Sequence, residues 1–241
     1  MKKLNKLKYD KVNILGKCNI NQSFMVDMMY SASTTDRAIN GTMIRFVNFW
    51  FNPSKSDYGS EEVYTSIVNR IVEKNSYMRE FKIKSLEVNF DYATELKFDQ
   101  LHTLAKIISD VLSSRGYKTV NINADIVRFD YRCDEFTNRY RSYKWYRQKG
   151  KNKFLEVKLY RKAEGVNRFE VIFHNVDCRH FKKLDESSIS SGTRINKTFQ
   201  AIYRDIFNLL EQDIQLWNDE GIAEFMNSFR MALDEDIEQV A

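Results

Sequence analysis

The chain is poor in the residues that mark turns, disulfide bonds and histidine metal sites. Its 241 residues include one proline, eight glycines, three cysteines and three histidines. The cysteines have neither metal-type nor oxidoreductase spacing, and their odd number fits a reduced cytosol rather than a disulfide framework. No two histidines lie two positions apart, which excludes a metal site of the His-hydrophobe-His kind.

Long apolar segments and nucleotide-binding loops are also missing. No stretch approaches the roughly 20 apolar residues of a membrane-spanning helix. Residues 1–6 carry lysines with no apolar run after them, so we expect no signal peptide, no membrane contact and a cytoplasmic location. Neither a phosphate-binding glycine loop, nor a dinucleotide fingerprint, nor a serine-nucleophile motif occurs.

Charge is present in quantity and is unevenly distributed. The formal net charge is +5, from 38 Lys and Arg against 33 Asp and Glu. Residues 139–162, hereafter the basic segment, hold ten basic residues and one acid, Glu156, whereas residues 204–241 hold ten acids and two bases. A basic segment in a chain with an acidic end predicts an anionic partner at that segment.

The hydrophobic pattern predicts an α+β fold, with an antiparallel sheet, helices packed on one face and a helical C-terminal segment. We expect one α+β domain over residues 1–185 and a helical segment over 186–241 packed on it. Strands are predicted over 8–17, 43–51, 82–90, 117–134, 155–162 and 168–174, the fourth broken around 123–124. Helices are predicted over 21–31, 61–74, 97–114, 197–218 and 222–240, and residues 138–153 as a hairpin or long loop.

Three of these strands alternate apolar and polar side chains, namely residues 127–134, 155–162 and 168–174. Because successive side chains point to opposite faces of a strand, each has one core face and one polar face. The predicted core face carries Val127, Phe129, Tyr131, Cys133, Leu155, Val157, Leu159, Phe169, Val171 and Phe173. The polar face carries Asp130, Asp134, Tyr160, Lys162 and Glu170.

The three carboxylates of this polar face predict a metal site. Asp130 and Asp134 lie on one strand and Glu170 on another, and oxygen ligands of this kind suit Mg²⁺ or Mn²⁺. The alternative is an ordinary solvated sheet face on which Arg132 bridges the two aspartates.

Tyr160 is the candidate nucleophile and Lys162 its candidate cationic partner. A tyrosine hydroxyl has an ordinary pKa of about 10, so attack at neutral pH requires a nearby cation or a metal-bound phosphate. Beside carboxylates, this pair suits metal-assisted attack on a phosphodiester. The alternative is an ordinary tyrosine of an amphipathic hairpin.

Aromatic and basic residues interleave in the basic segment, as is typical of single-stranded nucleic-acid binding. Aromatic rings stack on unpaired bases while cations follow the phosphates. The alternative is a hairpin whose aromatic residues pack on the core. The candidate DNA-binding residues are Arg132, Arg139, Arg141, Tyr143, Lys144, Trp145, Arg147, Lys149, Lys151 and Arg161.

The order of these motifs resembles that of the replication initiator proteins of small rolling-circle plasmids, in the branch without metal-binding histidines; conjugative relaxases are related. Residues 9–16, 86–90 and the helix over 97–114 resemble early elements of that family. Residues 129–134 resemble its D-x-A-x-D strand, 159–162 its Y-N-K motif and 168–170 its R-x-E strand.

The resemblance implies a DNA-nicking replication initiator. Tyr160 would cleave one origin strand and form a 5′-phosphotyrosine link and a free 3′ hydroxyl, Lys162 would steady the developing charge, and Glu170 would bind the metal. It implies origin DNA, a hairpin with a single-stranded nick site, as substrate, a host helicase as partner and a chain that pairs with itself.

Three positions depart from the family pattern. Arg132 replaces the small central residue of the acidic strand, Arg161 replaces an asparagine, and Ile172 stands where a second acid is common. A conjugative relaxase and a nuclease-dead DNA-binding protein, with Arg132 in the metal position, therefore remain alternatives.

Overall fold

The structure is a computed structural model that describes residues 7–52, 61–92, 98–120, 125–130, 135–149, 152–163, 165–176 and 189–237. Its strands are β1 (Lys8–Asn19), β2 (Ser31–Ile39), β3 (Thr42–Phe51), β4 (Arg79–Tyr92), β5 (Lys118–Val120), β6 (Asp125–Asp130), β7 (Glu135–Lys149), β8 (Asn152–Ala163) and β9 (Val166–Val176). Its helices are α1 (Glu61–Lys74), α2 (Phe98–Ser114), α3 (Ile189–Leu210), α4 (Ile214–Trp217) and α5 (Glu220–Ile237).

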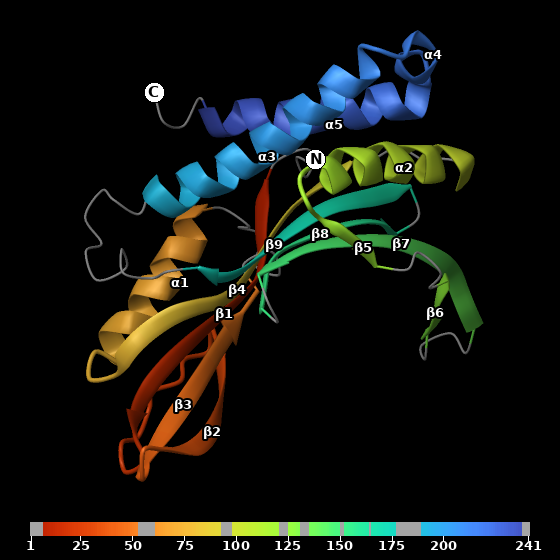
Figure 1. Ribbon diagram of the computed structural model, residues 1–241. Coiled ribbons are helices and arrows are strands. Elements are labelled where there is room, and N and C mark those ends of the chain that lie inside the picture. The colour runs from red at the N-terminus through yellow and green to blue at the C-terminus, as the bar shows by residue number, and fades with distance from the viewer. Residues whose placement is uncertain are drawn as a thin grey trace. The chain divides into compact units, whose positions relative to one another are not determined.

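The strands form one sheet in the order β2-β3-β1-β4-β9-β8-β7-β5, and β6 pairs with β7. The pairs β1–β3, β2–β3, β5–β7, β6–β7 and β7–β8 are antiparallel. The architecture is α+β, as the sequence predicts (Figure 1).

The chain divides into two compact units, whose boundaries fall just before β1 and within β4, β9 and α3. Unit 1 comprises residues 1–7, 89–171 and 193–241, and unit 2 comprises residues 8–88 and 172–192. This division differs from the expected boundary at residue 185, because the C-terminal helices belong to the same unit as β5 to β8.

Unit 1 has an aromatic core between its strands and its helices. The Phe90 ring of β4 lies 5.6 Å from Phe169 of β9 and 4.8 Å from Phe229 of α5, centroid to centroid. Phe199 of α3 packs edge-on against both Phe169 and Phe229. The helices α2, α3 and α5 lie on one side of the unit's strands (Figure 1). Because side chains alternate along a strand, the polar residues considered below point to the opposite face.

Unit 2 contains α1 and the antiparallel ribbon of β1, β3 and β2. The β2–β3 hairpin turns at Asn40 and Gly41, with φ values of 48° and 77°. Asn-Gly favours this turn because both central residues need a positive φ. Val12, Ile14, Val47 and Phe49 supply buried side chains from β1 and β3.

The sequence predicted most elements, but one predicted helix is absent and one strand was missed. In place of the helix expected over 21–31, residues 21–30 form a loop with an isolated bridge between Asp27 and Tyr30, and Ser31 begins β2. Asp27 pairs with Arg70 and Lys74 of α1 at 2.5 and 2.7 Å, so polar contacts fix the loop. The strand β2 was not predicted, because most of its residues are polar and exposed and lack a period-two pattern.

The predicted core face of the β8–β9 region is confirmed. Leu155, Val157, Leu159, Phe169, Val171 and Phe173 are buried. None of the helices that the structure describes is long and apolar enough to cross a membrane.

Candidate active site

Tyr160 and Glu170 meet on the polar face of β8 and β9. The Tyr160 hydroxyl donates a hydrogen bond to Oε2 of Glu170 at 3.1 Å, and Lys158 Nζ donates to Oε1 at 2.6 Å. Lys158 and Tyr160 are two positions apart on β8, so they share one face of the strand. The Glu170 side chain is only 2% exposed, which makes these contacts the compensation for burying its charge.

A second polar cluster follows on the same face. Arg168 Nε donates to Asp91 Oδ1 at 2.5 Å, and Arg168 Nη2 donates to Oδ2 at 3.0 Å. Lys162 Nζ donates to Asp91 Oδ2 at 2.9 Å. Asp91 is buried, which by itself raises the pKa of its carboxyl, but Arg168 and Lys162 more than offset this and hold that pKa below its ordinary value. Lys162, the predicted partner of Tyr160, is thus engaged with Asp91.

The environment of Tyr160 keeps its hydroxyl protonated. Burial raises the pKa of Tyr160 well above its ordinary value, and the negative charge of Glu170 raises it further. Arg168 acts in the opposite direction through its charge and a hydrogen bond. Ionisation of Tyr160 therefore needs additional positive charge near Glu170, or transfer of the proton to a base during attack.

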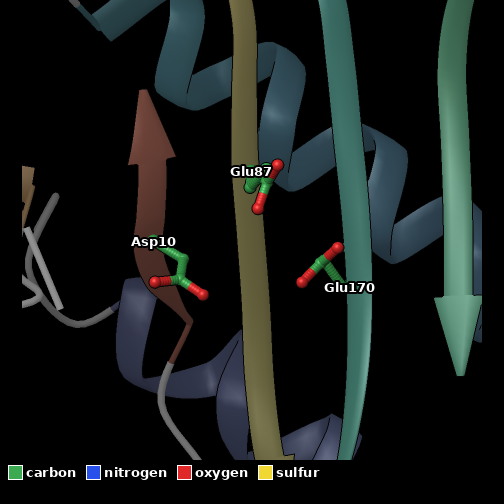
Figure 2. A group of neighbouring side chains, drawn as sticks. All are labelled: Asp10, Glu87 and Glu170. Atoms are coloured by element: carbon green, nitrogen blue, oxygen red, sulfur yellow. The ribbon is translucent and has the colours of Figure 1, made fainter. Parts of the chain in front are cut away.

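Further carboxylates lie on the neighbouring strands. Asp10 of β1 and Glu87 of β4 bring carboxylate oxygens within 4.8 Å of each other. Figure 2 labels both side chains, on β1 and β4. Sequence reasoning missed the pair, because only the strand order reveals that β1 and β4 are neighbours in the sheet.

Asn89 of β4 is another polar residue that the sequence did not single out. Its side chain is 0% exposed, and within the described structure neither its amide oxygen nor its amide nitrogen has a hydrogen-bond partner. Glu87, Asn89 and Asp91 alternate along β4 and share a face. These hard oxygen donors fit a Mg²⁺ or Mn²⁺ ion by type.

Asp130, the first acid of the predicted metal site, lies on β6, away from Tyr160 along the sheet. Backbone pairing places Asp130 of β6 opposite Glu135 of β7, whereas Ser142 of β7 lies opposite Tyr160. Between Glu135 and Ser142 an extended strand advances by about 23 Å, at about 3.3 Å per residue. The register thus separates Asp130 from the Tyr160–Glu170 pair. The side chain of Asp130, and Arg132 and Asp134 entirely, lie outside the described residues.

Tyr143 and Trp145 belong to the core, which corrects the expectation that they stack on DNA bases. Both side chains are 0% exposed, and their rings stack at 6.4 Å with 15° between planes. The Tyr143 hydroxyl lies 3.3 Å from Nδ1 of His102 on α2. Rings enclosed in this way offer no face to an unpaired base.

The described cations of the basic segment have local partners. Lys144 pairs with the buried Glu156 at 2.6 Å. The Arg147 guanidinium lies 5.4 Å from the centroid of the Phe154 ring, and its exposure leaves it accessible to a phosphate. Arg161 is partly buried. The side chains of Arg139, Arg141 and Lys149, and the whole of Lys151, lie outside the described residues.

Comparison with known proteins finds similar chains among solved structures. Neither a protein-family model nor a curated protein matches the chain. The chain is similar to the solved structure of a rolling circle replication initiator protein from Geobacillus stearothermophilus. The two are 13% identical, and the alignment covers 70% of this chain and 74% of that chain with a TM-score of 0.34. A likeness at this level assigns no role to any residue.

Proposed function

We propose that the protein nicks DNA, with Tyr160 as the nucleophile. The observation that carries the proposal is the hydrogen bond from Tyr160 to the buried Glu170, with Arg168 beside the same hydroxyl. A tyrosine on a sheet face, bonded to an acceptor and close to a cation, has the partners that an activated nucleophile needs. The polar face of β8 and β9 is then the catalytic surface.

The proposed reaction is a transesterification at one phosphodiester. As Tyr160 attacks phosphorus, its proton passes to Glu170, and the bond from phosphorus to the 3′ oxygen breaks. The products are a 5′-phosphotyrosine link and a 3′ hydroxyl, which takes up a proton. Arg168, held by Asp91, stabilises negative charge at the Tyr160 oxygen. Lys162 belongs to the same charged cluster.

The proposal includes a divalent cation, held at Glu170. The support is the buried Glu170 carboxylate, which lies beside the Tyr160 hydroxyl on the polar face of β8 and β9. When bound, Mg²⁺ or Mn²⁺ polarises the scissile phosphate as a Lewis acid. Asp130 is not part of this proposal, because the strand registers separate it from Tyr160 along β7. The metal-binding role of Asp134 stays a prediction.

Replacement of Tyr160 by Phe tests the proposal. We expect Y160F to lose strand cleavage and covalent attachment by at least 1,000-fold, because phenylalanine has no hydroxyl to attack phosphorus. This loss corresponds to a barrier higher by about 4.1 kcal/mol. The variant should keep its DNA affinity. Y146F is the matched control, because Tyr146 is a partly buried tyrosine of the adjacent strand β7. The assay follows nicking of supercoiled and single-stranded DNA and maps the protein–DNA adduct. Normal cleavage by Y160F refutes the assignment.

One observation favours a second function, a DNA-binding protein without nuclease activity. Lys158 already neutralises Glu170 at 2.6 Å, so it provides a cation without a metal. Chelation separates the two functions. A nuclease should lose cleavage in excess EDTA and in the Glu170→Gln variant, and regain it in the parent on addition of Mn²⁺. A protein that binds DNA but never nicks it, with or without Mn²⁺, supports the second function.

Origin DNA with a single-stranded nick site is the proposed substrate. A host helicase partner, a homodimer and the distinction from a conjugative relaxase stay predictions. Size-exclusion chromatography with light scattering tests the dimer, and cleavage of hairpin against linear origins tests the substrate form.

A further inference from the structure

The buried amide of Asn89 has no hydrogen-bond partner in the part of the chain that the structure describes, which is energetically unfavourable. Its amide is 0% exposed, and both its oxygen and its nitrogen lack hydrogen-bond partners. Burying an unpaired amide is unfavourable, so such a group points to a partner outside the chain. An apolar side chain of similar volume would avoid this cost if Asn89 only filled space.

The contacts of unit 1 place Asn89 beside Glu170. Asp91 of β4 bonds to Arg168 of β9 on the polar face, and Phe90 contacts Phe169 on the helix-covered face. From the first contact to the second, the residue number decreases by one on β4 and increases by one on β9, which is the pattern of antiparallel strands. The next pair is Asn89 with Glu170, whose side chains then point to the polar face with Cβ atoms about 5 Å apart.

The carboxylate of Glu170 leaves Asn89 unbonded. Its two oxygens accept hydrogen bonds from Lys158 and Tyr160, and the Asn89 amide nitrogen donates to neither oxygen. Asn89 therefore has an unpaired neutral amide oxygen on the same face as the Glu170 carboxylate, and the two are hard ligands of the kind that suits Mg²⁺ or Mn²⁺.

We infer that Asn89 is a further ligand of the divalent cation at Glu170, through its amide oxygen. The inference rests on the proposed function for the identity of the cation, but not on DNA cleavage itself. A neutral oxygen beside the Glu170 carboxylate adds to the coordination of a cation that takes six or more oxygens, without adding negative charge. It also leaves positions for a phosphate.

The test measures Mn²⁺ binding by isothermal titration calorimetry on the full chain without DNA, together with thermal unfolding with and without Mn²⁺. We expect Asn89→Leu to weaken Mn²⁺ binding by roughly tenfold or more, the effect typical of losing a group from a metal site. The same variant should melt higher than the parent without metal, because the unpaired amide is gone. Asn89→Asp should bind Mn²⁺ more tightly than the parent.

Asn48→Leu is the matched control. The amide oxygen of Asn48, on β3, is also buried without a partner, but it belongs to the β1–β3–β2 ribbon. This variant should bind Mn²⁺ as the parent does.

Three results would overturn the inference: no Mn²⁺ binding by the parent, unchanged affinity in Asn89→Leu, or equal weakening in Asn48→Leu. If Asn89→Leu does not fold, Asn89→Asp decides, and weaker or unchanged Mn²⁺ binding rejects the role. A parent that binds Mn²⁺ through Asn89 but cleaves no DNA refutes the proposed function and leaves this inference standing.

Discussion

The buried Asp91 carboxylate on the polar face is neutralised by basic side chains. It accepts hydrogen bonds from Arg168 and Lys162, and the Arg168 side chain is itself only 6% exposed. Removing one partner of a buried pair leaves the other charge without compensation. Asp91 therefore has a structural role in addition to positioning Arg168 near Tyr160.

We expect Asp91→Asn to lower the free energy of unfolding at pH 7 by about 3 to 5 kcal/mol, the usual cost of breaking a buried ion pair. The pKa of Asp91 is lowered in the folded state, so its stabilisation is present above its unfolded pKa of about 3.9. It is lost as the pH falls through the folded pKa. The difference between parent and variant should thus shrink in acid.

Urea denaturation at pH 7 and near pH 3 measures this difference. Asp36→Asn is the control, because the Asp36–Arg45 pair joins two partly exposed side chains and exposed pairs contribute little. A difference in the Asp91 variant that stays constant with pH would contradict the role assigned to this carboxylate.

At the scale of the element, strand β7 shows why a sequence pattern can support two structures. Alternating aromatic and basic residues are compatible with a DNA-binding surface and with a strand that has one core face. The decision depends on α2, a remote segment, because His102 on that helix contacts Tyr143. The sequence of β7 alone contains no sign of that contact.

We expect Tyr143→Ala and Trp145→Ala each to lower the free energy of unfolding by about 3 to 5 kcal/mol, the range for truncating buried aromatic residues. DNA affinity per folded molecule should not change, since both rings are enclosed. Chemical denaturation and a DNA titration on the same samples measure the two effects. If a variant lost DNA affinity while its free energy of unfolding stayed unchanged, the residue would belong to the DNA-binding surface after all.

Short-range patterns predicted the helices α1 and α2 and the β8–β9 hairpin because their apolar spacing is regular. The same alternation put Tyr160 and Glu170 on one face, and the hydrogen bond between them confirms that placement. By contrast, the sequence could not predict that β4, which carries Asn89, is the neighbour of β9, which carries Glu170. That pairing depends on the order of strands from distant parts of the chain, which no local pattern encodes.

At the scale of the whole molecule, the uneven distribution of charge predicts which part of the chain would contact DNA phosphates. The basic segment spans most of β7 and β8, where Lys144 and Lys158 are engaged with Glu156 and Glu170. Cations committed to internal pairs contribute less to phosphate binding than exposed ones. Arg147 is an exposed cation of β7, and Lys149 and Lys151 follow it in the sequence.

We expect the triple variant Arg147→Gln, Lys149→Gln, Lys151→Gln to bind DNA more weakly and with a flatter salt dependence. Removing one cation from a DNA phosphate lowers the slope of log K against log salt by about 0.9 for duplex and about 0.7 for single strands, because fewer counterions are released. Fluorescence anisotropy over a range of salt concentrations measures the slope. Lys144→Gln is the control and should change it less, since Glu156 already neutralises Lys144. An unchanged slope in the triple variant would remove this part of the basic segment from the DNA-binding surface.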